Sequence, residues 1–172
     1  DVAPDAAFAL AAIDYASVAI VTYVFDESPD FVGSGFLVPP VDGTFIKAAT
    51  VSSNKWGWVA DTGRTVIRAS VGRAGEATLL QHDDGDISDR ALADLRTAFG
   101  GLPAPIDSVV QRWGGGLPQY DVGHLDRVDT IDRSVATVPG LEVCGAAYRG
   151  VGIPAVIASG RAAARRILDE GQ

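Results

Sequence analysis

The chain has 172 residues, with 14 Lys and Arg against 22 Asp and Glu, so its formal net charge is −8. A hydrophobic fraction of 47% is enough to bury a core and excludes a disordered chain. The acidic balance argues against binding nucleic acid or anionic lipid through a basic face. The single cysteine, Cys144, excludes an internal disulfide, and two histidines leave little for a metal site. No apolar run reaches the ~20 residues of a membrane helix.

The chain contains no methionine and opens on Asp1. We therefore expect it to be a piece of a longer protein. Arginine greatly outnumbers lysine, and alanine is abundant, which is typical of a GC-rich bacterial gene.

The first third of the chain predicts one helix and then strands. Apolar spacing predicts a helix over 3–13. The β-branched and aromatic run at 16–25 predicts a strand, and because it is apolar on both faces we expect cover on both sides. Three further strands are predicted at 34–39, 44–52 and 64–71. Between the last two lies a loop, 53–63, that exposes Trp56 and Trp58.

The middle of the chain adds one helix and one strand. A helix over 88–99 would begin at the N-cap Ser88 and stop at Gly100. Residues 106–112 predict a strand, and the Gly- and Pro-rich stretch 113–120 predicts irregular backbone.

The last third changes character. A helix over 124–137, started by a capping His124, precedes a buried strand at 141–147 that includes Cys144 as a core residue. A glycine-rich turn then leads to a helix over 153–169 with an inward apolar stripe. The change predicts an α/β (α+β) protein with one domain over 1–116, built on a mixed sheet, and a second over 117–172.

Two segments are candidates for ligand contact. Gly150 and Gly152 let the backbone approach a ligand at the start of the last helix, whose free N–H groups favour an anionic or polar group. The alternative is that these glycines only turn the chain. Trp113 stands beside three glycines, which suits a flat ligand lying against the indole. The alternative is a core tryptophan that closes a loop.

Together these segments resemble a known family. The stretches GLPQYDVGHLDRV and LEVCGAAYRGVGIPAVIASGRAAARRIL are similar to the C-terminal part of the oxygen-dependent porphyrinogen oxidases, the protoporphyrinogen and coproporphyrinogen III oxidases of heme biosynthesis. The stretches GFLVPP, KAATVSSNKW, VIRASVGRAG and DISDRALADLRTAFG occur in the family's order. The resemblance covers the chain from Ala6 onward. The YRGVGIP turn alone is shared with amine oxidases and desaturases.

The resemblance implies a two-part fold and an FAD cofactor. A sheet domain would bind the porphyrinogen, and 117–172 would be the C-terminal strand–helix return of a doubly wound FAD domain. The family's G-x-G-x-x-G turn is absent from this sequence, so the resemblance implies that most FAD contacts come from an N-terminal half of the same protein. The chain alone would not hold FAD firmly.

The resemblance also implies site residues. Trp113, Val151, Gly152 and Ile153 match positions that approach the flavin. Leu37 matches a leucine that clamps the tetrapyrrole. Thr50 and Ser70 stand where plant and animal enzymes carry large apolar residues, which implies a roomier and more polar wall. Lys47 would face a propionate, or else be a solvated surface lysine. No catalytic side chain is identified.

The expected activity is oxidation of a porphyrinogen to the porphyrin with O2 as acceptor, with coproporphyrinogen III favoured over protoporphyrinogen IX. Two alternatives remain. One is a flavin amine oxidase or desaturase, and the other is a tetrapyrrole-binding module without catalysis. We expect a cytoplasmic protein, with a peripheral membrane contact as an option for the intact enzyme, and no nucleic-acid partner.

Overall fold

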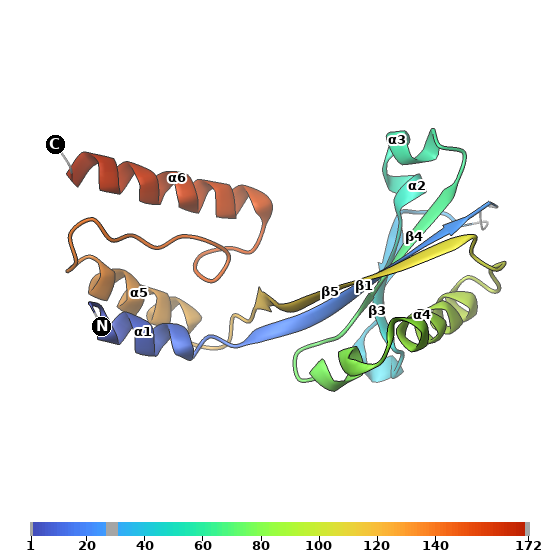
Figure 1. Cartoon of the computed structure of the whole chain (residues 1–172), viewed down its shortest axis with the longest axis horizontal. Helices are drawn as coiled ribbons and strands as arrows, with labels where there is room; N and C mark the ends of the chain where they lie inside the picture. The colour runs from blue at the N-terminus through green and yellow to red at the C-terminus, as the bar shows by residue number, and fades with distance from the viewer. Residues whose placement is uncertain (1, 27–30, 171–172) are drawn as a thin grey trace. The chain divides into compact units, whose positions relative to one another are not determined.

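A computed structural model describes residues 2–26 and 31–170. The chain divides into two compact units (Figure 1). The first, which we call the helical unit, comprises Asp1–Tyr15 and Leu117–Gln172, and the second, the sheet unit, comprises Ala16–Gly116. The helix expected at 3–13 thus belongs to the same unit as residues 117–172. The mixture of helices and strands expected from the sequence is confirmed.

The sheet unit is a five-stranded sheet in the order β2-β3-β4-β1-β5. The pairs β1–β4, β3–β4 and β2–β3 are antiparallel, so the sheet is antiparallel there rather than mixed. Its strands are β1 (Tyr15–Phe25), β2 (Gly35–Leu37), β3 (Ile46–Val51), β4 (Thr65–Val71) and β5 (Asp107–Pro118). Its helices are α2 (Ser52–Lys55), α3 (Gly57–Ala60) and α4 (Asp84–Ala98), with 3-10 turns at Pro40–Asp42 and Ala77–Gln81.

The core of the sheet unit lies between one face of the sheet and α4 (Figure 1). Strand residues two apart share a face, so alternate residues of β1, β3 and β4 point to the helix. This core is made by Val21, Tyr23, Phe25, Ile46, Val51, Ile67 and Val71 from the strands and by Ile87, Ala91, Leu92 and Leu95 from α4. Tyr23 donates a hydrogen bond of 2.6 Å to the carbonyl of Ser88, which fixes α4 on the sheet.

The two-sided cover expected for strand 16–25 is wrong for the described residues. Val21, Tyr23 and Phe25 are fully buried, whereas Ile20, Thr22 and Val24 between them are only half-buried. Hydrophobicity alone does not show whether a face is covered, because cover depends on which element packs there.

Three expected elements of this unit also differ. The loop expected at 53–63 contains the short helices α2 and α3, although Trp56 and Trp58 are exposed as expected. The helix α4 begins earlier than expected, because the Asp83 carboxylate caps it by accepting from the Asp86 amide at 2.8 Å. The strand β5 runs on to Pro118 through the glycines that were expected to be irregular. These glycines have a low strand propensity, but pairing with β1 supplies the hydrogen bonds of a strand.

The helical unit contains α1 (Pro4–Ala11), α5 (His124–Val135) and α6 (Ile153–Glu170). Small and branched side chains pack α1 against α5 (Figure 1): Ala6, Ala9, Ile13, Ile131 and Val135. The strand expected at 141–147 is wrong, since residues 141–144 have no regular secondary structure, 145–147 form a bend and a turn, and Cys144 is exposed. A strand needs a neighbour to pair with, and no described strand lies beside this segment.

The helix α6 leaves most of its apolar side chains exposed. Ala163 is buried, but Ile153, Ile157, Ile167 and Leu168 are exposed. The inward stripe expected on this helix is therefore not covered by the described residues. Within those residues no helix has the length and apolar character that a membrane crossing requires.

Candidate functional site

The turn before α6, residues 146–152, is one candidate site, and it lies in the helical unit. The carbonyl of Gly152 accepts the first helical hydrogen bond, 3.0 Å from the Val156 amide. Val151 and Ile153 on either side of it are exposed. Pro154 has no N–H, so among the described residues the amide donors of the first helical turn without an intrahelical partner are those of Ile153 and Ala155.

The backbone requires a glycine at position 150 but not at position 152. Gly150 has a φ of +153°, and a Cβ there would lie 2.8 Å from the Ala155 Cβ. Gly152 has no left-handed φ, and a Cβ there would meet only the Pro154 Cδ, at 3.9 Å. Gly150 is thus a glycine required by the turn itself. Within the described residues, nothing requires a glycine at position 152.

Two aromatic side chains hold this turn in place. The Tyr120 hydroxyl donates to the Ala146 carbonyl at 2.6 Å and accepts from the Gly150 amide at 2.9 Å. The His124 ring stacks on Tyr120 with centroids 3.8 Å apart, and its Nε2 lies 2.8 Å from the Tyr148 carbonyl.

The histidine contact also fixes a tautomer. A carbonyl oxygen only accepts, so His124 Nε2 carries the proton and Nδ1 is left as an acceptor. Nδ1 is buried and has no partner among the described residues. His124 therefore supports the turn, and its expected role as a helix cap is wrong because Gly123 occupies that position.

We expect Tyr120→Phe to lower the free energy of unfolding of the chain by about 1 kcal/mol, because it removes two hydrogen bonds from the turn. Urea unfolding followed by circular dichroism measures this. Tyr15→Phe is the matched control, since Tyr15 is also exposed and its hydroxyl has no hydrogen bond to another described residue. Equal stability of the two variants would contradict the assignment.

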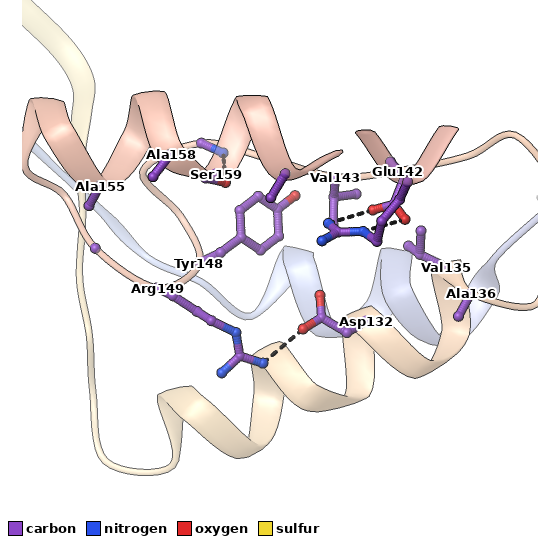
Figure 2. A pocket seen from close by; sticks show the side chains of 14 residues that line it. Asp132, Val135, Ala136, Glu142, Val143, Tyr148, Arg149, Ala155, Ala158 and Ser159 are labelled. Atoms are coloured by element: carbon purple, nitrogen blue, oxygen red, sulfur yellow. Dashed lines mark hydrogen bonds and ion pairs between the residues drawn. The ribbon is translucent and has the colours of Figure 1, made fainter. Parts of the chain in front are cut away.

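A cavity of about 630 Å³ opens between the turn, α5 and α6 (Figure 2). Arg149 bonds Asp129 at 2.6 Å and Asp132 at 2.8 Å, and these contacts raise its pKa. On the other side Arg166 binds both oxygens of Glu142, which lowers the pKa of that carboxyl. Figure 2 shows the Tyr148 ring between the two helices, and burial raises its pKa. The charges of the cavity are thus paired within the unit.

A separate candidate site lies on the sheet unit. We call the face of β1–β4 that points away from α4 the open face, because its side chains are half-buried or exposed. The pairing register places these residues on it: Ile20, Thr22, Val24, Leu37, Ala48, Thr50, Val66, Arg68 and Ser70. Leu37, Thr50 and Ser70, predicted separately from the sequence, therefore share one surface.

Lys47 lies beside this surface. It occupies an irregularity in the register between Ile46 and Ala48 and lines a cavity of about 460 Å³ with Leu37, Val38, Pro39 and Ala48. Burial lowers the pKa of Lys47, and the nearby Arg73 guanidinium lowers it further. Lys47 is half-buried and not a fully solvated surface lysine.

Strand alternation also places the side chain of Trp113 on β5. Val110 packs on the core side, so alternation places Trp113 on the opposite side of the strand, where its side chain is 56% exposed. It does not close a core. No cluster of three or more His, Cys, Asp or Glu side chains suited to a metal occurs within residues 2–26 and 31–170.

Comparison with known proteins identifies the family. Residues 2–168 match the family described as flavin containing amine oxidoreductase. Coproporphyrinogen III oxidase of Bacillus subtilis is 36% identical over 151 residues, which are 86% of this chain and 32% of that protein. The enzyme of the same name from Mycobacterium leprae is 36% identical over 163 residues, 94% of this chain and 35% of its own. The chain thus spans about a third of the length of these relatives.

Solved structures agree with the sequence matches. A crystal structure from Exiguobacterium, assigned as a protoporphyrinogen oxidase, superposes with a TM-score of 0.82 at 34% identity, over 92% of this chain and 36% of that one. Reduced UDP-galactopyranose mutase superposes with a TM-score of 0.52 at 13% identity, a likeness of fold alone. Because the family match runs almost from end to end, the chain belongs to the flavin-containing amine oxidoreductases.

Proposed function

We propose that this chain is the C-terminal part of an FAD-dependent oxidase that converts coproporphyrinogen III to coproporphyrin III. The reaction removes six hydrogen atoms from the macrocycle and reduces three O2 to three H2O2. The N-terminal part of the same protein would supply the remaining FAD contacts. The observation that supports this proposal is the open face, because hydroxyl, apolar and cationic side chains lie together there on one surface of a family member.

The turn before α6 suits one edge of a flavin. The free N–H donors beside Gly152 would hold a polar or negatively charged ring edge, and the missing Cβ leaves the approach open. FAD, when bound, would supply hydride acceptance from the macrocycle and electron transfer to O2. Val151, Gly152 and Ile153 would orient the ring. Trp113, on the sheet unit, is by the family resemblance a further candidate for flavin contact.

The sheet unit would bind the porphyrinogen. Leu37 offers an apolar contact to the macrocycle, and the Thr50 and Ser70 hydroxyls keep the wall polar. Lys47, at the edge of the open face, would meet a propionate. A carboxylate facing a purely apolar wall would cost a few kcal/mol, and this wall avoids much of that cost.

The exposed surface of α6 in the helical unit suggests a further contact within the intact protein. The exposed apolar side chains of α6 would be covered by the N-terminal part of the FAD domain. We propose a cytoplasmic location for the intact protein. Trp56 and Trp58 are an exposed pair for a partner or a peripheral membrane contact.

The full-length protein tests the function. Purified with FAD, it should convert coproporphyrinogen III to a fluorescent porphyrin, consume O2 and release H2O2. Porphyrin formation no faster than the uncatalysed rate would overturn the proposal. Oxidation of a simple amine in its place would favour the amine oxidase alternative.

The chain by itself should behave differently. We expect residues 1–172 to purify colourless and to oxidise no porphyrinogen, because the N-terminal strand–turn–helix that grips the FAD pyrophosphate in this family is not in the sequence. The flavin absorbance of the purified chain after incubation with FAD measures this. A stably yellow chain would show that residues 1–172 suffice to hold the cofactor.

A further inference from the structure

Arg68 stands in the middle of the open face between two threonines. In the register it lies opposite Thr22 on β1 and opposite Thr50 on β3, so the three side chains form one row across three strands. Residues directly opposite each other in antiparallel strands have Cβ atoms roughly 5 Å apart. Thr22 and Thr50 are two strands apart, roughly 10 Å, with the Arg68 guanidinium between them, so the arginine and a neighbouring hydroxyl can contact one small ligand group.

The arginine of this row is not paired with any residue that the structure describes. Among the described residues no hydrogen bond or ion pair involves Arg68, although every other arginine of the sheet unit has one. These others bind Asp26 (Arg64), Glu76 (Arg73), Asp86 (Arg90), the Leu102 carbonyl (Arg96) and Asp84 (Arg112). Within 16–26 and 31–116, Arg68 is thus the arginine whose donors have no partner.

The charge around Arg68 favours an anion. The protein carries a net charge of −8, yet β1, β2, β3 and β4 contain no Asp or Glu and two cations, Lys47 and Arg68. Apolar and small neighbours flank the row, with Val24 and Val66 on one side and Ile20 and Ser70 on the other. Arg68 itself is exposed, so its guanidinium is accessible to a ligand.

We infer that Arg68, with Thr22 and Thr50, is a carboxylate-binding subsite of the open face and takes a propionate of the porphyrinogen. The planar guanidinium can donate two parallel hydrogen bonds to one carboxylate. The threonine hydroxyls supply further donors. The inference rests on the function proposed above and adds the residue that recognises the acid group.

Binding of the reaction product to the full-length enzyme tests this subsite. The probes are coproporphyrin III and its tetramethyl ester, which keeps the macrocycle and lacks the acid groups. Arg68→Gln should weaken binding of the acid about tenfold or more and leave binding of the ester unchanged. Arg68→Lys keeps the charge but not the forked donors. Its dissociation constant for the acid should lie between those of the wild type and Arg68→Gln. Fluorescence quenching measures each dissociation constant.

Arg90→Gln is the matched control. It removes the same charge from α4, which covers the opposite face of the sheet, and should leave both dissociation constants unchanged. Equal weakening of acid and ester in Arg68→Gln, or the same loss in Arg90→Gln, would overturn the subsite. These outcomes require a wild-type enzyme that makes porphyrin. A wild type without that activity would instead overturn the proposed function.

Discussion

Gly152→Val in the full-length enzyme is expected to abolish FAD binding while both units stay folded. The turn before α6 is proposed to touch the flavin through its backbone, so a branched side chain there would occupy the ring's place. Overlap of this kind costs about 3 kcal/mol or more, which is over a hundredfold in Kd. Inside the chain the same side chain meets little, because Gly152 has no left-handed φ and a Cβ finds only Pro154 Cδ at 3.9 Å.

The measurement is the FAD content of the purified protein, with thermal unfolding as the test of integrity. Gly57→Val is the matched control, since Gly57 also lacks a left-handed φ and has no heavy atom within 4 Å of its added Cβ. Gly150→Ala should destabilise the turn itself, since its Cβ would lie 2.8 Å from that of Ala155. Full FAD occupancy in Gly152→Val would show that position 152 does not face the ring.

Substrate preference should respond to Ser70 on the open face. Wild-type enzyme is expected to prefer coproporphyrinogen III, and Ser70→Phe should move the ratio of kcat/KM toward protoporphyrinogen IX by about tenfold or more. Ser70 lies opposite Ile20 and Ala48 and two residues from Arg68 on the same face. A phenyl ring there would fill space, exclude water and leave a propionate less well solvated, whereas a vinyl group would gain an apolar contact.

Thr97→Phe provides the control, because it adds the same ring to an exposed position of α4, away from the open face. Its ratio of kcat/KM for the two porphyrinogens should match that of the wild type. A wild-type preference for protoporphyrinogen IX, or an unchanged ratio in Ser70→Phe, would mean that Ser70 does not shape the substrate wall.

The sequence by itself was sufficient for elements whose patterns are local. The helix α5 and the strands β3 and β4 have regular apolar spacing in the sequence. Gly100, with φ +70°, ends α4 as expected. The order of short motifs was also enough to indicate the family, because it does not depend on how the segments pack. Leu37, Thr50 and Ser70 could be named in this way, but not placed on a common surface.

Tertiary structure decided the features that depend on pairing between distant segments of the chain. Residues 141–147 are as apolar as a buried strand, yet without a neighbouring ladder they form none, whereas β5 continues through three glycines because β1 pairs with it. Arg68 has no sequence signal of its own. Its place between Thr22 and Thr50 comes from the register of three strands, and a shift of one residue would turn it to the core. Local pattern sets which elements can form, and pairing across the chain sets which side chains meet.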